Sequence, residues 1–88
     1  MSQISCVVVT PEQMVLEEKA DFVALPLYDG EVGILPNHAP FMAPLGRGTM
    51  TVTTAGAPTR FRVDGGFLQV VSNTVRVVAE KVERETRA

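Results

Sequence analysis

The sequence predicts an all-β domain, a flattened antiparallel β-sandwich or barrel of about ten short strands. Apolar and polar residues alternate along several short segments of the chain, and this period of two places one face of a strand in a core and the other in water. Gly, Pro, Asn and Asp residues separate these segments at short intervals. Many short strands divided by turn residues are typical of a β-sandwich or barrel.

Two segments alternate most clearly, 49–54 and 59–64, and Ala55-Gly56-Ala57-Pro58 predicts the turn between them. Threonines fill the outward face of the first segment, whereas arginines and an aspartate fill that of the second. The inward residues expected here are Met50, Val52, Phe61 and Val63.

Strand patterns also cover the rest of the domain, which we place at residues 1–79. The further segments expected as strands are 4–9, 14–18, 20–27, 67–71 and 74–79. Because Pro26 lacks a backbone N–H, the end of segment 20–27 is expected to lie at a sheet edge or a bulge. Gly65-Gly66 bends the chain, and Ser72-Asn73 predicts a two-residue hairpin turn. The charged tail 80–88 contains no Gly or Pro, which is compatible with the start of a helix.

Composition restricts the function classes. The chain has 88 residues, enough for one small domain, and a net charge of −2, which gives no attraction for nucleic acid or an anionic membrane. No apolar run reaches the ~18–20 residues of a bilayer span, and no signal peptide begins the chain. We therefore expect a protein that is cytoplasmic or docked at a cytoplasmic face. The single cysteine, Cys6, is expected to be a small buried hydrophobe without a disulfide.

Residues 29–40 are the most informative segment, because they hold two acids, two glycines, two prolines and the only histidine. Asp29-Gly30 predicts a tight turn. A short buried strand is expected to follow, with Val32, Ile34 and Leu35 as its apolar residues. Pro36-Asn37-His38-Ala39-Pro40 then predicts a second turn, stiffened by two prolines. Glu31 and His38 are expected near the tips of these turns, on a surface suited to docking.

The same residues argue against catalysis and metal binding. Asp29, Glu31 and His38 form an imaginable acid–base set, but no Ser or Cys has a matching partner and a loop tip offers no buried pocket. Further His or Cys residues at ligand spacing are missing from the sequence, so no metal site is expected. No phosphate-binding loop motif occurs, and no cofactor is expected.

Four segments, in order and spread over nearly the whole chain, carry a resemblance to a known family. They are 8–13 (VVTPEQ), 29–40 (DGEVGILPNHAP), 65–70 (GGFLQV) and 73–79 (NTVRVVA). Together they resemble the N-terminal domain of the epsilon subunit of F-type ATP synthases. The resemblance implies a flattened antiparallel sandwich and a non-catalytic subunit of the central stalk. Such a subunit binds gamma and the c-ring, couples proton-driven rotation to ATP synthesis, and lies on the cytoplasmic face of a bacterial inner or thylakoid-like membrane without inserting into it.

The resemblance also implies which residues meet each partner. Toward the c-ring, whose polar loops carry Arg and Gln in this family, it implies Asp29, Glu31 and His38. Toward gamma it implies Thr10, His38, Ala39, Pro40, Phe41 and Met42. Without the resemblance, Glu31 is more simply a solvated acid, His38 a structural turn residue, and the apolar residues Phe41, Met42 and Leu45 part of the core.

The chain departs from the family after the sandwich. Most epsilon subunits continue into two C-terminal helices that restrain ATP hydrolysis, and some bind ATP through an (Ile/Leu)-Asp-x-x-Arg-Ala motif. Arg87-Ala88 matches the end of that motif, but Glu83 and Arg84 occupy its apolar and Asp positions. We therefore expect little or no inhibitory arm, in either a short subunit or a piece of a longer one.

The alternative hypothesis is a small β-barrel module that binds a ligand or nucleic acid. Arg60 and Arg62 form a small basic face, but the inward position of Phe61 leaves no aromatic among them for base stacking. Formation of a one-to-one complex with gamma distinguishes the two hypotheses.

Overall fold

The computed structural model describes residues 3–85, which form eight strands and no helix. The all-β prediction is confirmed, although the number of strands is eight rather than about ten. The strands are β1 (Ile4–Val9), β2 (Met14–Ala20), β3 (Phe22–Leu27), β4 (Gly30–Ile34), β5 (Phe41–Pro44), β6 (Arg47–Thr54), β7 (Ala57–Val71) and β8 (Thr74–Arg84).

All eight strands belong to one sheet with the order β2-β1-β8-β7-β6-β3-β4, and β5 pairs with β7 outside this path. The pairs are antiparallel except for β1 and β8, which are parallel. The expected antiparallel sandwich is therefore confirmed except for this one parallel pair. It forms because β7 and β8 make a hairpin, and the start of β8 pairs with β1 on its other side.

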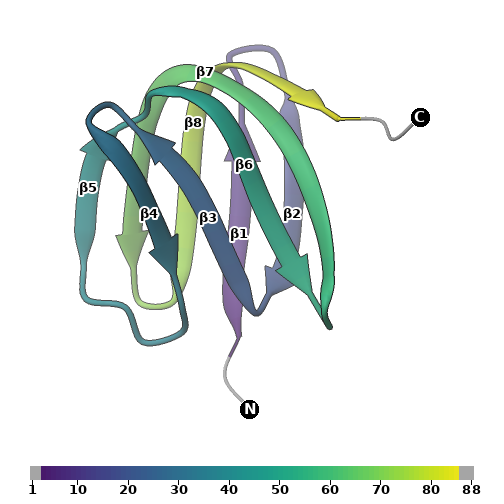
Figure 1. Cartoon of the computed structure of the whole chain (residues 1–88), viewed down its shortest axis with the longest axis vertical. Helices are drawn as coiled ribbons and strands as arrows, with labels where there is room; N and C mark the ends of the chain where they lie inside the picture. Colours follow the sequence, from purple (N-terminus) through teal and green to yellow (C-terminus); the bar gives the residue numbers. More distant parts are fainter. Residues whose placement is uncertain (1–2, 86–88) are drawn as a thin grey trace.

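The sheet folds over on itself because β7 and β8 are long enough to belong to two layers (Figure 1). β6 pairs with residues 57–64 of β7, and β5 pairs with residues 67–70. We call β2, β1, the first half of β8, the second half of β7 and β5 the first layer. The second layer contains the end of β8, the first half of β7, β6, β3 and β4.

Gly65 and Gly66 form the corner at which β7 passes from one layer to the other. Before the corner Phe61 and Val63 are buried, whereas after it Leu68 and Val70 are buried, so the inward positions change from odd to even. The two glycines have φ values of +71° and +114°, and a Cβ on Gly66 would overlap the carbonyl oxygen of Val78. Only glycine allows this backbone path.

The core lies between the layers and is apolar throughout. All four residues predicted to face inward, and Cys6, are buried, so these predictions are confirmed. The buried core residues are Ile4, Cys6, Val8, Ala20, Val23, Leu25, Ile34, Leu45, Met50, Val52, Phe61, Val63, Leu68, Val70, Val75, Val77 and Ala79.

Several strand boundaries differ from those predicted. Segments 59–64 and 67–71 form one strand because Gly65-Gly66 bends the ladder to β8 without ending it. The turn before them is shorter, since Ala55 and Gly56 alone have positive φ values of 53° and 79° and β7 begins at Ala57. Strand β5 was not predicted.

The start of the tail is strand rather than helix. Residues 80–84 continue β8, where they pair with β7, and the backbone N–H of Glu85 donates to the carbonyl oxygen of Arg60 at 2.9 Å. The backbone N–H and C=O groups in the first half of β7 offer this segment a ladder of hydrogen-bond partners, which a helix would not use. The last three residues of the tail, 86–88, lie outside the described residues.

Strand β4 is less buried than predicted. Ile34 is buried, but Val32 is only half-buried and Leu35 is 59% exposed. The reason is that β4 is the last strand of the sheet and pairs on one side only, with β3.

The corner glycine predicts a large difference between two Gly→Ala substitutions. Gly56→Ala keeps a strained positive φ but meets nothing within 4 Å, so it should cost only about 1–2 kcal/mol of stability. Gly66→Ala adds a clash with the Val78 carbonyl, and we expect a loss of more than about 3 kcal/mol. Urea unfolding followed by circular dichroism measures both, and equal losses would contradict the corner constraint.

The burial of the Cys6 thiol predicts that the domain loses stability at alkaline pH. Burial first, and the Glu18 carboxylate second, raise the pKa of the Cys6 thiol from 9.0 to about 12. As the pH rises past 9.0, the unfolded chain loses this proton first, so the native state is destabilised between these two values. The free energy of unfolding should fall by up to about 1.4 kcal/mol per pH unit more steeply than in Cys6→Ala. Parallel pH profiles of the two proteins would contradict this prediction.

Candidate docking surfaces

The first candidate surface is the acidic tip between β3 and β4. Leu27 pairs with Gly30, which leaves Tyr28 and Asp29 as a two-residue turn, and Glu31 follows on β4. The Tyr28 side chain is 81% exposed, and both acids are exposed. The Tyr28 N–H donates to the Pro44 carbonyl at 3.1 Å, which ties the tip to the end of β5. The predicted turn is confirmed here, shifted by one residue.

The second candidate surface is the connection 35–40 between β4 and β5, which carries His38. The His38 ring meets the Phe41 ring edge-on, with centroids 5.9 Å apart and an interplanar angle of 64°. Its Nδ1 atom lies 2.7 Å from the carbonyl oxygen of Ala39. The backbone N–H of Asn37 donates to Asn73 Oδ1 at 2.6 Å. This connection is therefore fixed both locally and against the β7–β8 turn.

The structure separates these two surfaces. We call the end of the sandwich with Gly65-Gly66 the corner end and the end with Ser72-Asn73 the hairpin end (Figure 1). Glu31 lies on β4 at the corner end and His38 lies beyond β4 at the hairpin end, and the five residues of β4 span about 13 Å. The structure therefore places His38 apart from Asp29 and Glu31, because the two turns that carry them lie at opposite ends of β4.

Thr10 lies in the β1–β2 turn, also at the corner end (Figure 1). Its N–H donates to the Gln13 carbonyl at 2.9 Å, and its hydroxyl accepts from the Gln13 N–H at 3.4 Å. Thr10 and His38, both expected to face gamma, therefore border opposite ends of the first layer. The outer face of that layer connects them.

An apolar row crosses this outer face, and sequence reasoning missed it. The pairing register aligns one residue from each of five strands at the same level, namely Met14, Val9, Val78, Phe67 and Pro44. We call these residues the apolar row.

The apolar row is open to solvent. Met14, Phe67 and Val78 are 55%, 42% and 46% exposed, and Met42 on β5 adds a further apolar side chain that is 59% exposed. A set of exposed apolar residues that is continuous across strands marks an interaction surface more often than scattered ones do. The sequence held one signal, because Val8-Val9, Phe67-Leu68 and Val77-Val78 are adjacent apolar pairs of which alternation buries only one member.

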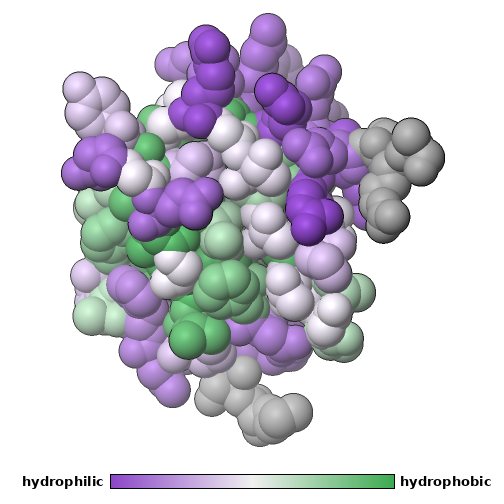
Figure 2. All heavy atoms as spheres, in the orientation of Figure 1, coloured by the Kyte–Doolittle hydropathy of each residue, from purple (hydrophilic) through white to green (hydrophobic). Residues whose placement is uncertain are grey.

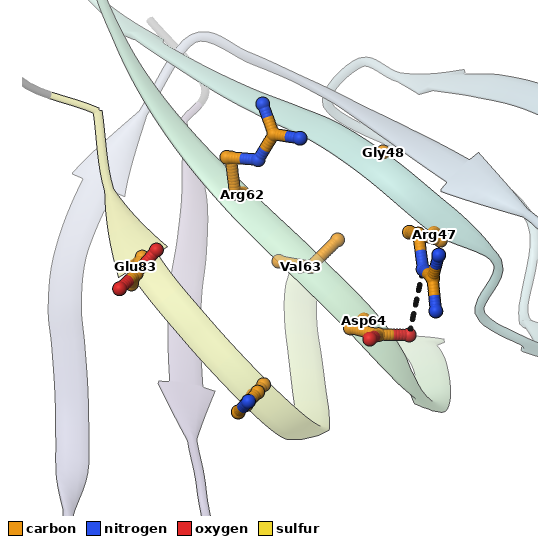
Figure 3. A pocket seen from close by; sticks show the side chains of 7 residues that line it. Arg47, Gly48, Arg62, Val63, Asp64 and Glu83 are labelled. Carbon is orange, nitrogen blue, oxygen red and sulfur yellow. Dashed lines mark ion pairs between the residues drawn. The ribbon is translucent and has the colours of Figure 1, made fainter.

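The outer face of the second layer is divided (Figure 2), with polar side chains gathered toward the corner end and apolar ones nearer the hairpin end. A hollow of about 310 Å³ lies there between β6, β7 and β8, lined by Arg47, Arg62, Asp64, Lys81 and Glu83 among others (Figure 3). Arg47 Nε lies 3.5 Å from Asp64 Oδ1, although both side chains are largely exposed. Basic and acidic groups alternate here, so the hollow offers no uniform charge to a ligand.

Residues 3–85 contain no group of three or more His, Cys, Asp or Glu residues arranged to hold a metal ion. No helix in this range is long and apolar enough to cross a membrane.

Comparison with known proteins decides the family. The family described as "ATP synthase, Delta/Epsilon chain, beta-sandwich domain" matches residues 3–85. The chain belongs to this family. The resemblance of the four sequence segments to an epsilon subunit is thereby confirmed.

Individual relatives agree with this assignment. An "ATP synthase epsilon chain" of Rhodopirellula baltica is 49% identical over 75 residues, which cover 85% of this chain and 59% of the relative. One of Nitratidesulfovibrio vulgaris (strain Miyazaki F) is 47% identical over 77 residues, covering 88% of this chain and 58% of the relative. The epsilon-type chain thus spans less than two thirds of the length of these relatives.

Solved structures confirm the fold of the epsilon-type chain. A chain from the cryo-EM structure of the Euglena gracilis mitochondrial ATP synthase, in an assembly that includes the c-ring, superposes with a TM-score of 0.88. It is 21% identical, and the match covers 93% of this chain and 53% of that one. At this identity the likeness shows the β-sandwich alone.

Proposed function

We propose that this chain is a non-catalytic subunit of the central stalk of an F-type ATP synthase. It binds gamma and the c-ring and passes the rotation of the ring to gamma. The observation that carries the proposal is an exposed apolar face on a domain of the ATP synthase delta/epsilon family. Torque transfer of this kind requires interface area and rigidity rather than a reacting group.

The apolar row and Met42 form the proposed gamma surface. Burying apolar area there yields about 25 cal/mol per Å², and the sheet beneath is already ordered, so little conformational entropy is lost on binding. Thr10 at one end and His38, Ala39 and Pro40 at the other border the same face and extend it. On the outer face of the second layer, by contrast, polar side chains gather toward the corner end (Figure 2).

The tip with Asp29 and Glu31 forms the proposed c-ring surface. Both carboxylates are exposed, and a partner loop that carries Arg meets them with charge-assisted hydrogen bonds. The corner end that bears this tip also adjoins the apolar row, so one rigid body contacts both partners. His38, at the hairpin end, then belongs to the gamma surface alone.

A complex with both partners places the chain at the membrane without entering it. In a bacterium this is the cytoplasmic face of the inner membrane.

The alternative of a nucleic-acid-binding module has no support from the comparisons, and Phe61, the one aromatic among the arginines of β7, is buried. Native mass spectrometry with purified gamma of the same source tests the choice: a one-to-one complex supports the proposal, and its absence at micromolar concentration overturns it.

Met42→Asp should weaken gamma binding at least about tenfold, because a carboxylate at an apolar contact must be desolvated without a partner. Ala57→Asp is the control, since Ala57 is also exposed but lies at the start of β7, in the second layer. We expect less than about a twofold change for it. Isothermal titration calorimetry with gamma measures both, and equal effects of the two substitutions would refute the assignment of the face.

Glu31→Lys should weaken attachment to the c-ring without unfolding the domain. The substitution changes stability by no more than about 0.5 kcal/mol at an exposed tip, but it places like charges opposite each other at a basic partner. Glu83→Lys, an exposed charge reversal on β8, serves as the control. Proton-driven ATP synthesis by the reconstituted enzyme is the measurement, and full activity of Glu31→Lys would show that the tip makes no essential contact.

A further inference from the structure

The connection 35–40 depends on one side chain outside it. Among residues 3–85, the hydrogen bonds that join this connection to another segment are the two between Asn37 and Asn73. The Asn37 N–H donates to Asn73 Oδ1 at 2.6 Å, and Asn73 Nδ2 lies 3.4 Å from Asn37 Oδ1. The remaining hydrogen-bond contact of the connection, between His38 Nδ1 and the Ala39 carbonyl, is internal.

Asn73 is itself held in place by its turn. It has a positive φ of 59°, as does Ser72 at 51°, and together they form the two-residue turn between β7 and β8. Its carbonyl oxygen accepts the N–H of Ser5 at 2.8 Å, which fixes the turn to the start of β1. Asn adopts positive φ at low cost, so its amide projects from a rigid base toward the connection.

Asn37 needs this support. It too has a positive φ, 69°, and it is exposed in a turn between Pro36 and His38. The two prolines of the connection fix their own φ angles but donate no backbone hydrogen bond. Without Asn73, the connection is therefore stiff locally but free to change its angle relative to the first layer.

We propose that Asn73 is a positioning residue for the gamma surface. It does not need to touch gamma: through Asn37 it orders the segment that presents His38, Ala39 and Pro40 beside Met42. This inference rests on the proposed binding of gamma and adds to it a residue from a different hairpin. Ordering before association lowers the entropy lost on binding, so loss of this contact weakens affinity without removing any contact with gamma.

Three substitutions at one position separate the side chain from the backbone. Asn73→Gly keeps the positive φ and removes the amide, and Asn73→Ser shortens the side chain to a residue that Ser72 shows to be tolerated in this turn. Asn73→Asp keeps an oxygen that accepts the Asn37 N–H. Ser72→Gly is the control for turn flexibility, because it changes the neighbouring residue and leaves the Asn37–Asn73 contact intact.

Two measurements on the full chain test the inference. Hydrogen exchange at the Asn37 amide should become at least about tenfold faster in Asn73→Gly and Asn73→Ser, with strand amides unchanged. The dissociation constant for purified gamma should rise about three- to tenfold in the same two variants. Both quantities should stay within about twofold of the original in Asn73→Asp and Ser72→Gly.

The outcomes that oppose the inference differ from those that oppose the proposed function. Faster exchange at Asn37 with unchanged gamma affinity overturns the positioning role while leaving gamma binding intact. Unchanged exchange in Asn73→Gly shows that the contact does not order the connection and overturns the inference at its first step. If the original chain itself fails to bind gamma, the proposed function fails and the positioning role fails with it.

Discussion

The close approach of Gly66 to the carbonyl of Val78 governs the architecture of this domain. Because a side chain has no room there, β7 can turn sharply while it keeps its ladder to β8 on both sides of the corner. The turn reverses which face of β7 is buried, and this reversal lets one long hairpin supply strands to two layers. Without it, the apolar faces of β5 and β6 would not enclose a common core.

The corner also gives the domain two unlike outer faces. Before it, the outward residues of β7 include Arg62 and Asp64, and after it they include Phe67 and Val71. The outer face of the first layer therefore carries the apolar row, whereas that of the second carries the Arg47–Asp64 ion pair toward its corner end. A domain so divided is expected to bury one face against a partner and leave the other in water.

The local alternation of polar and apolar residues was sufficient to predict most strands and the core, but not the docking surfaces. Met50, Val52, Phe61 and Val63 were assigned correctly because each lies in a segment with strict period-two alternation. Strand β5 was missed because its four residues, Phe41–Pro44, end in a proline and contain no alternation of polar and apolar types. The start of the tail was misjudged because its charges are compatible with a helix or a solvated strand, and only pairing with β7 decides between them.

Predicting the apolar row would have required the pairing register of the strands, which depends on residues far apart in the sequence. Phe67 and Val78 are eleven positions apart, Val9 is distant from both, and only the parallel pairing of β1 with β8 places all three on one level. Likewise, the resemblance implied that Glu31 and His38 share the c-ring side, whereas β4 holds them at opposite ends of the sandwich. A short strand between two turns separates their tips.

The separation of the acidic tip from the connection that carries His38 suits the proposed role better than a single cluster of these residues would. A coupling element that touches two partners transmits torque only if its two contact surfaces are fixed relative to each other. Here the acidic tip is bonded to the end of β5 through Tyr28 and Pro44, and the far end of β5 leads back to the connection that Asn37 and Asn73 hold. The proposed c-ring and gamma surfaces are thus joined through hydrogen-bonded backbone and a packed core rather than through flexible loops. Such a body resists deformation, because close-packed interiors transmit strain instead of absorbing it.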